Sequence, residues 1–431
     1  MGPDTKGGIT MDALNVINYV ISVIFILCYS YQFLYILVPV LKKAKPHKEE
    51  QVHNYAVLIS ARNEQAVIGN LLDSIARQTY NRGSVTVFVV ADNCTDETAR
   101  VSREHGAVVF ERFDTTQIGK GYALAYLMER IDERYPGKPF DGYFVFDADN
   151  VLEDSYIAEM NRTFSDGYEV VTSYRNSKNY GDNWISAGYA LWFLRESQYL
   201  NRCRALLGTS AAVSGTGFLF SRRAIDECGG WHFFLLTEDI EFTIECVTRG
   251  WKIGYCEKAV LYDEQPTKFR QSWHQRLRWS RGYLQVFRKY GGKLVSGVTH
   301  GSFACYDMSM AIMPAAVLSL VGLVANCAAT TLSILAGSGL DTVLLSLGSL
   351  LFSSCIAVLV IGTVTTITEW KRIYAPAWKK VLYNFTFPLF MLTYVPIAFA
   401  SLFARRVGWK HIEHTRSATV ADIRSAGAKI A

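Results

Sequence analysis

Apolar residues gather in long runs near the N-terminus and in the last third of the chain, whereas the middle alternates short apolar and polar stretches. Residues 16–41 form one such run without a charged residue, and about 20 residues suffice to cross a bilayer. A basic cluster follows it, made of Lys42, Lys43, Lys45 and Lys48. Because only Lys6 is positive before the run, the positive-inside tendency places residues 1–15 outside and the following residues in the cytosol. The length of the run and the basic cluster disfavour the alternative of a cleaved signal peptide.

Two further apolar runs, residues 304–335 and 343–368, predict two membrane-spanning helices within residues 303–368. The loop between these runs carries no lysine or arginine, as expected for an outside loop, and residues 369–380 are basic, as expected inside.

The last apolar run, residues 381–403, is interrupted by Pro388 and Pro396. If it crossed the membrane, the basic tail that follows would lie outside, against the positive-inside tendency. We therefore expect residues 369–403 to lie at the interface or to re-enter the membrane, and residues 404–431 to form a cytosolic tail. The expected topology has three spans and two interfacial segments.

Between these runs, residues 55–261 alternate between strand and helix patterns. The expected strands are Tyr55–Ser60, Val85–Ala91, Ala107–Phe110 and Gly142–Phe146, and the expected helices are Glu64–Arg77, Asp96–His105 with Thr95 as N-cap, and Lys120–Arg134. This alternation predicts an α/β domain with a mostly parallel sheet and helices on both faces. Ligands of such sheets bind at the carboxyl ends of the strands.

Polar residues follow three of the predicted strands, namely Arg62, Asn63 and Glu64, then Asp92 and Asn93, then Asp147 and Asp149. The two carboxylates of Asp147-Ala148-Asp149 suit Mg²⁺ or Mn²⁺, which commonly bridge protein carboxylates to substrate phosphates. A helix cap with a surface acid is the alternative for this triplet, and its position at a strand end favours the metal site.

Two small-residue segments also suit a phosphorylated substrate. Gly119-Lys120-Gly121 opens a helix, where backbone amides and an ammonium face an anion, although a solvated loop lysine is an equal alternative. Residues 214–218, Ser-Gly-Thr-Gly-Phe, form a turn that lets a substrate approach the backbone.

Two acids and a basic helix complete the candidate chemistry. Glu238 or Asp239, at the start of a predicted helix, is a candidate general base, a role worth about 10² to 10⁴ in rate. Residues 267–302 contain an amphipathic helix expected at the membrane interface. Gln275, Arg278 and Trp279 share a face of it, so they can hold a diphosphate and stack on a sugar.

Composition narrows the function further. The chain has 431 residues, of which 50% are hydrophobic and 19% charged, a high apolar content for a soluble protein. The nine cysteines include no CxxC pair, so we expect free thiols rather than a zinc site or a disulfide framework. The net charge of +5 is modest, and we expect no nucleic-acid partner.

Six motifs occur in order: Ser60-Ala-Arg-Asn-Glu64, Asp92 within ADNCTDET, Lys120-Gly-Tyr-Ala-Leu124, Asp147-Ala-Asp149, Thr237-Glu-Asp239 and Gln275-Arg-Leu-Arg-Trp279. Together they resemble the membrane-embedded family 2 glycosyltransferases, which include cellulose, hyaluronan and chitin synthases. The resemblance covers about residues 55–279 and the flanking apolar pattern.

The resemblance implies a cytosolic GT-A domain over residues 55–266, a UDP-sugar donor, Mg²⁺ or Mn²⁺, and inversion at the anomeric carbon. It assigns the donor to Ala61, Arg62, Glu64, Asp92, Lys120, Asp147, Gln275 and Arg278, the metal to Asp149 with Asp147, and catalysis to Asp239 beside Glu238. It assigns the acceptor to Trp279 and the turn at Ser214, Gly215 and Thr216. Residues 408–416 match the position, not the sequence, of a gating loop, with Trp409, His411, His414 and Thr415 as its candidates.

We therefore expect a multi-pass plasma-membrane enzyme that extends a β-glucan processively from UDP-glucose at the cytosolic face, with the nascent polysaccharide and the bilayer as partners. The alternatives are a hexosamine polymer synthase using UDP-GlcNAc, a non-processive transferase adding one sugar to a lipid carrier, and a membrane scaffold. Three spans are few for a secretion channel, so translocation would call for a homo-oligomer.

Overall fold

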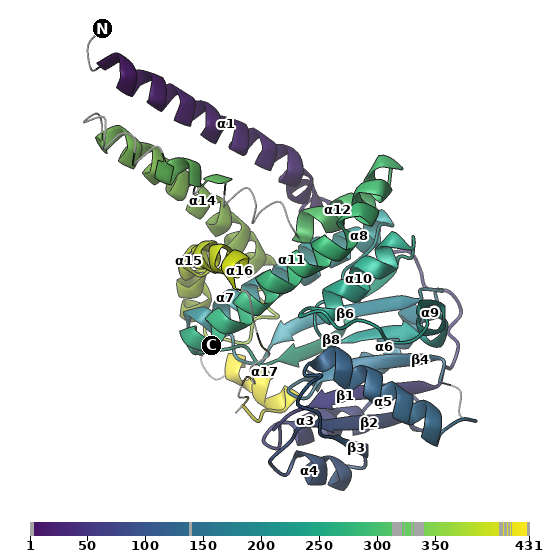
Figure 1. The fold of residues 1–431 in the computed structure, drawn as a ribbon. Helices are drawn as coiled ribbons and strands as arrows, with labels where there is room; N and C mark the ends of the chain where they lie inside the picture. The colour runs from purple at the N-terminus through teal and green to yellow at the C-terminus, as the bar shows by residue number, and fades with distance from the viewer. Residues whose placement is uncertain are drawn as a thin grey trace.

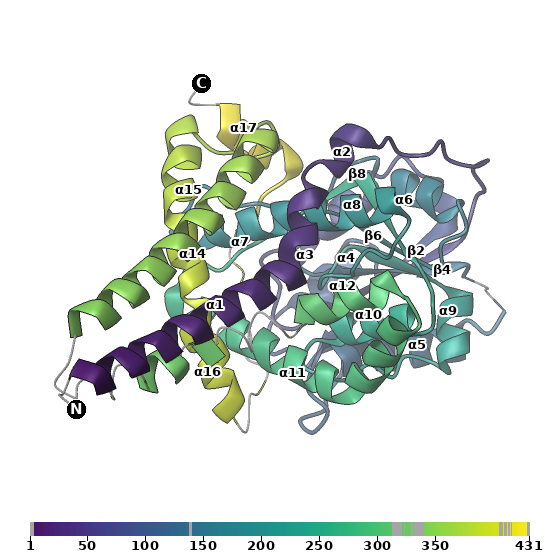
Figure 2. The same cartoon turned by 90° about the horizontal axis from the view of Figure 1, so that it is seen from above.

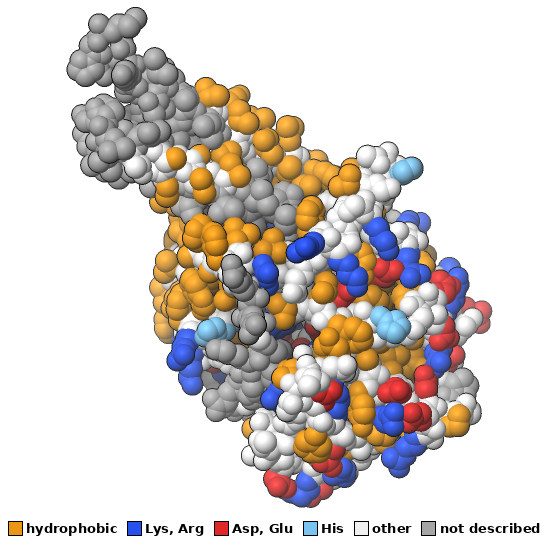
Figure 3. Space-filling view, viewed as in Figure 1, with side chains coloured by type: hydrophobic (Ala, Val, Ile, Leu, Met, Phe, Trp, Pro, Cys, Tyr) orange, Lys and Arg blue, Asp and Glu red, His pale blue; other side chains and the backbone are white. Residues whose placement is uncertain are grey.

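The computed structural model describes residues 4–137, 140–312, 321–322, 324–328, 331, 340–404, 408, 412, 414 and 416–428. A sheet-containing domain forms one part of the molecule, and long helices project from it (Figures 1 and 2). Charged side chains gather on the domain, and apolar side chains cover the described parts of the projecting helices (Figure 3).

Within the described residues, the domain is built on one mixed sheet of eight strands. Its parallel half contains, in spatial order, β3 (Val108–Arg112), β2 (Val85–Asp92), β1 (Tyr55–Ala61) and β4 (Gly142–Asp147). Its other half contains β7 (Phe218–Ser221), β6 (Val170–Ser177), β8 (Ile253–Asp263) and β5 (Val151–Leu152). Strand β7 is antiparallel to both β4 and β6, an insertion that the sequence pattern did not predict.

The strand register aligns the carboxyl ends of the parallel strands. Ser60 pairs with Asp147, and Asp92 pairs with Arg112 on the neighbouring strand. The polar residues that follow these strands therefore meet at one edge of the sheet, as predicted.

Helices cover both faces of the sheet because alternate strand residues point to opposite sides. On one face, Leu58 and Val90 pack with α5 (Lys120–Arg134), α7 (Trp184–Arg195) and α10 (Glu238–Thr248). On the other, Val57 and Val89 pack with α3 (Ile68–Ala76) and α6 (Tyr156–Phe164). The shorter helices of the domain are α4 (Thr98–Glu104), α8 (Arg202–Leu207) and α9 (Arg222–Cys228), and a π-helical turn covers Glu196–Asn201.

Two predicted helix starts are wrong by a few residues. Helix α3 begins at Ile68 rather than Glu64. Helix α4 begins at Thr98, because Asp96 rather than Thr95 accepts hydrogen bonds from the Thr98 amide and hydroxyl. By contrast, α5 has the predicted bounds.

The long amphipathic helix α11 (Phe269–Thr299) ends in a turn at Gly301, after which α12 (Phe303–Ile312) packs against it. Helix α12 covers the start of the apolar run 304–335, and most of the rest of that run lies outside the described residues. The remaining helices are α1 (Asp4–Tyr35), α2 (Val38–Leu41), α14 (Leu340–Thr368), α15 (Ala377–Leu392), α16 (Tyr394–Phe403) and α17 (Val420–Ala428). Helices α1 and α14 project from the domain in the same direction (Figures 1 and 2).

Three described segments are long and apolar enough to cross a membrane: Tyr19–Leu41, Leu351–Thr368 and Ala377–Phe403. The third contains the run that we expected at the interface, and its two helices meet at Thr393. Length and composition do not decide between spanning and interfacial placement, so the topology stays a prediction.

A buried ion pair ties α1 to the domain. Arg204 of α8 donates to both carboxylate oxygens of Asp307 of α12, at 2.7 and 2.9 Å. The hydroxyls of Tyr31 and Tyr35 on α1 donate to the same carboxylate, at 2.7 and 3.1 Å. Both charged side chains are at most 2% exposed, so the four groups form one closed junction.

Candidate active site

The first wall of the site lies at the carboxyl ends of β1 and β2. Ala61, Arg62, Glu64 and Asp92, the predicted nucleoside residues, all line one cavity there. Burial raises the pKa of Asp92, and the guanidinium of Arg112, which donates to Asp92 at 2.7 Å, opposes this effect. Sequence reasoning missed Arg112, although it stands opposite Asp92 once β2 and β3 are aligned.

Lys120 lies at the start of α5, where the expected anion site is. Gly119 takes a positive φ of 138°, and a Cβ on Gly121 would lie 2.1 Å from the carbonyl oxygen of Phe233, so this turn requires glycine. The Lys120 ammonium donates to Asp147 and, at 2.7 Å, to the carbonyl oxygen of Gly215. It therefore links the strand-end acids to the Ser214–Phe218 turn.

Asp149 is the better placed of the two predicted metal ligands. Both residues line the cavity, but within the described part of the chain the Asp149 carboxylate accepts only the Glu264 amide, at 2.8 Å, and the Asn150 side chain, whereas that of Asp147 is paired with the Lys120 ammonium. Among the described residues, no three His, Cys, Asp or Glu side chains form a metal cage. One or two carboxylates nevertheless fit a Mg²⁺ or Mn²⁺ that takes its other ligands from substrate phosphates and water.

The turn that precedes β7 contains the three predicted acceptor residues, and only two of them line the cavity. Ser214 and Gly215 line the cavity, and Arg175 fixes them by donating to the Ser214 carbonyl at 3.0 Å and to Asp263 at 2.6 Å. Thr216 is 3% exposed and lies outside the cavity lining, because its hydroxyl accepts the Asp147 amide at 2.9 Å. The Thr216 side chain thus lies off the cavity lining, and its role in acceptor binding stays a prediction.

The two acids of the Thr237-Glu238-Asp239 motif begin α10 and line the cavity. The Gly215 amide donates to Asp239 at 2.6 Å. Burial raises the pKa of both carboxyls, and the nearby charges of Lys120 and Arg278 oppose that rise. Asp239 is more exposed than Glu238, so it is the acid better able to meet an incoming hydroxyl.

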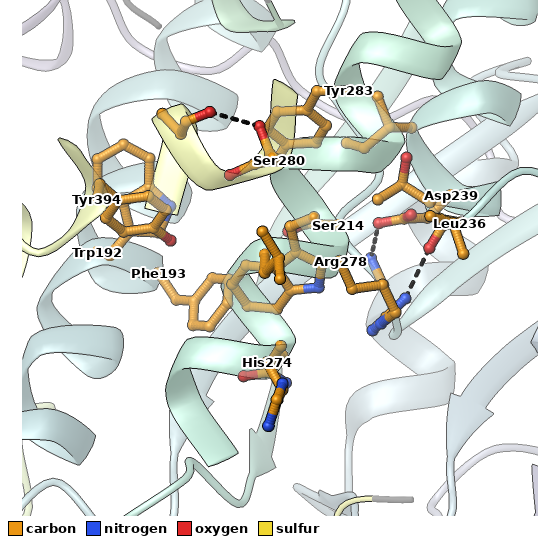
Figure 4. Close-up of a pocket in the computed structure, with 18 of the residues that line it drawn as sticks. Trp192, Phe193, Ser214, Leu236, Asp239, His274, Arg278, Ser280, Tyr283 and Tyr394 are labelled. Carbon is orange, nitrogen blue, oxygen red and sulfur yellow. Dashed lines mark hydrogen bonds between the residues drawn. The ribbon is translucent and has the colours of Figure 1, made fainter. Parts of the chain in front are cut away.

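Helix α11 turns the predicted motif residues toward these acids. Gln275, Arg278 and Trp279 line the cavity, and Arg278 donates to the Leu236 carbonyl at 2.7 Å, next to Asp239 (Figure 4). Trp279 contacts Phe193 edge to face, with ring centroids 6.1 Å apart.

Arg276, inside the same motif, faces the other way. It is fully buried and donates at 2.6 Å to the hydroxyl of Thr393, the residue between α15 and α16. Its guanidinium also lies over the rings of Phe390 and Tyr394, at 4.5 and 4.8 Å. The motif therefore joins the cavity to the apolar helices.

The C-terminal segment reaches the first wall of the site, at the carboxyl ends of β1 and β2, which we call the donor wall. His414 lies 3.0 Å from both carboxylate oxygens of Glu64 and lines the cavity, and the Arg416 amide donates to Glu264. Burial lowers the pKa of His414, but the carboxylates of Asp149, Glu64 and Glu264 outweigh it and raise the pKa to about 10. Trp409, His411 and Thr415, the other gating candidates, lie outside the described residues.

The donor residues, Asp149, Asp239, Lys120 and Arg278 all line one cavity of about 2180 Å³. It runs from the donor wall past Asp239 and α11 to residues of α1, α14 and α16. The candidate base, the candidate phosphate ligands and the apolar helices therefore share one continuous space.

Comparison with known proteins agrees with this geometry. Residues 53–282 match the family described as Glycosyltransferase like family 2. The beta-monoglucosyldiacylglycerol synthase of a Nostoc species is 26% identical over 269 residues, covering 59% of this chain and 54% of that protein. The poly-beta-1,6-N-acetyl-D-glucosamine synthase of Staphylococcus epidermidis is 22% identical over 241 residues, covering 56% and 57%. The chain thus spans about half the length of the curated relatives it matches.

Among solved structures, a mannosyltransferase from Pyrobaculum calidifontis, in complex with GDP-Man and Mn²⁺, has a TM-score of 0.56. It is 15% identical, and the alignment covers 91% of this chain and all of that one, a likeness that shows the fold alone. The predicted α/β fold of the GT-A type is confirmed. Because the family match covers more than half of the sequence, the chain belongs to glycosyltransferase family 2.

Proposed function

We propose that the chain transfers a sugar from a UDP-sugar to an acceptor hydroxyl, with inversion, at the cytosolic face of the plasma membrane. The carrying observation is that Asp239 shares one cavity with the strand-end donor wall and with Lys120 and Arg278. A base and two cations around one space suit a reaction in which a hydroxyl loses a proton and a diphosphate leaves.

The proposed division of labour follows from the contacts. Ala61, Arg62, Glu64 and Asp92 would receive the nucleoside, and Lys120, Gln275 and Arg278 would hold the diphosphate. Asp149 would hold Mg²⁺ or Mn²⁺, which supplies positive charge opposite the leaving diphosphate. Asp239 would take the proton of the acceptor hydroxyl as its oxygen bonds to the anomeric carbon and the bond to the diphosphate breaks. One displacement inverts the anomeric carbon without a covalent sugar–enzyme intermediate.

UDP-glucose is the first donor to test, followed by UDP-GlcNAc. The relatives named above act, by their names, as a glucosyl and an N-acetylglucosamine synthase, which supports testing both.

A processive β-glucan synthase is the second candidate. The QxxRW run supports it, as does the aromatic contact of Trp279, which could stack on a growing chain. Secretion of such a polymer would call for a homo-oligomer. Product length separates the candidates, because a polymerase releases chains and a single transfer does not.

The test is UDP release and sugar transfer by the full chain in lipid membranes, with each UDP-sugar in turn. Asp239→Asn should lower transfer by about 10² to 10⁴, and Asp149→Ala should abolish its metal dependence. Asp154→Asn is the matched control, because this exposed acid lies outside the cavity lining. Wild-type transfer by Asp239→Asn would overturn the mechanism.

A further inference from the structure

The cavity has a second end that the transfer reaction does not use. Beyond Asp239 it continues between the apolar helices, as a space that we call the apolar arm. Its lining is mostly apolar, and it includes Phe25 and Phe33 of α1, Leu351 and Val358 of α14, and Ala398 and Leu402 of α16, with a few serines of the same helices among them. These helices contain the segments long and apolar enough to cross a membrane.

Aromatic rings stand between the apolar arm and the acids. Trp192 and Phe193 of α7 and Tyr394 of α16 lie on one side of the site, and Arg278 and Asp239 lie on the other (Figure 4). The rings of Trp192 and Tyr394 are 6.5 Å apart, centroid to centroid. A ligand held at Asp239 can therefore extend past these rings into apolar surroundings.

The lining of the apolar arm favours hydrocarbon over a sugar chain. Each residue of a polysaccharide carries several hydroxyls, and burying them without hydrogen-bond partners is unfavourable. A hydrocarbon chain has no polar groups that need hydrogen-bond partners when it is buried. Because the arm lies between candidate spans, such a chain can reach it from the bilayer without crossing water.

The acids at the junction restrict the headgroup. A phosphorylated headgroup carries negatively charged oxygens already, so it would leave the candidate base Asp239 without a role. A neutral headgroup with a free hydroxyl needs the deprotonation that Asp239 can provide.

We propose that the acceptor is a neutral membrane lipid whose free hydroxyl lies at Asp239 while its hydrocarbon chain occupies the apolar arm. The proposal rests on the function proposed above and names its acceptor class. The hydroxyl oxygen bonds to the anomeric carbon, its proton passes to Asp239, and the nucleoside diphosphate leaves. The product is a lipid that carries one added sugar.

A substitution in the apolar arm separates this proposal from the general function. Val358→Trp places bulk in the arm, and Val360→Trp is the matched control, because Val360 is on the same helix, 52% exposed and outside the cavity lining. Ala398→Phe narrows the arm from the opposite helix and serves as a second variant. The probes are a radiolabelled UDP-sugar and vesicles of phosphatidylcholine with diacylglycerol.

We expect labelled lipid in the organic extract of the wild type and of Val360→Trp. Val358→Trp and Ala398→Phe should lower it by about tenfold or more, while release of UDP to water continues and shows that the donor site is folded. Labelled polymer or free sugar without labelled lipid would show that the acceptor is not a neutral membrane lipid, while the proposed transfer function would still hold. Equal lipid labelling in the arm variants and the control variant would show that the hydrocarbon chain of the acceptor does not occupy the apolar arm. Absence of UDP release from every donor would overturn the function itself.

Discussion

At the scale of single residues, the site depends on charges that burial holds away from their usual pKa values. Asp239 must be ionised to accept a proton, and burial raises its pKa. Its neighbour Glu238 carries a raised pKa too, first through burial and then through the charge of Asp239. Asp239 therefore sets the acid side of the activity profile.

We expect kcat/KM to fall on the acid side at a pH above the value of about 3.9 typical of an aspartate, because protonation of Asp239 removes the base. Glu238→Gln should leave this acid limb in place, because the charge of Asp239 raises the pKa of Glu238, so that Glu238 is already protonated where Asp239 titrates. The measurement is a pH–rate profile of sugar transfer for both proteins. A shift of the acid limb in Glu238→Gln would indicate that Glu238, rather than Asp239, is the base.

Arg112 supports a second prediction at this scale. It is 6% exposed and holds Asp92, whose side chain is 8% exposed. Arg112→Met leaves that carboxylate buried without its partner, which costs about 3–5 kcal/mol of stability. We expect a lower thermal unfolding midpoint and a higher KM for the donor. Arg100→Met, which removes a guanidinium from an exposed pair, should change neither.

At the scale of elements, local pattern predicted the parallel half of the sheet and missed the insertion of β7. The strands from Tyr55 to Asp147 alternate with helices whose apolar periodicity is strong. Strands β1, β2 and β3 are neighbours both in sequence and in space, whereas β4 crosses back to pair with β1. Strand β7 is only four residues long, and its pairing with β4 and β6 depends on contacts far apart in the chain. Its place in the sheet therefore could not follow from local periodicity.

The same limit applies to the site. Asp147, Asp149 and Asp239 line the cavity, and the sequence could indicate them because they stand at strand or helix ends; their chemical roles stay predictions. The partners Arg175 and Asp263, and Glu64 and His414, lie 88 and 350 residues apart. No sequence spacing marks such pairs, since the fold alone brings them together.

The junction of α1, α8 and α12 supports a prediction about elements. Asp307→Asn would leave Arg204 buried without a counter-charge and weaken both tyrosine contacts, so we expect a loss of about 3–5 kcal/mol. Adding Arg204→Met should restore part of that loss, because the unpaired charge is then absent. Thermal unfolding of the single and double variants in lipid nanodiscs measures the coupling. Additive losses would show that the two charges do not act as a pair.

At the scale of the whole molecule, two segments beside the cavity connect the apolar helices to the sheet-containing domain. Helix α11 carries Arg278 toward the acids and Arg276 toward the α15–α16 junction. The C-terminal segment follows α16 and returns to the donor wall at His414. Helix α11 and the segment after α16 therefore both connect the cavity lining to the helices α15 and α16.

The contact of His414 with Glu64 allows a test of whether the C-terminal segment contributes to donor binding. The pKa of His414 is raised to about 10, so its imidazole is charged at neutral pH, 3.0 Å from the Glu64 carboxylate. A charge-assisted hydrogen bond is worth about 1.5–3 kcal/mol, and each 1.4 kcal/mol or so corresponds to about tenfold in affinity. If the segment helps to hold the donor, His414→Ala should raise the donor KM about tenfold or more and change kcat less.

Arg424→Ala is the matched control on α17, because its ion pair with Glu153 is exposed on the arginine side and outside the cavity lining. Steady-state kinetics over donor concentration distinguish the two variants, and an unchanged KM in His414→Ala would mean that the segment rests on the donor wall without contributing to binding.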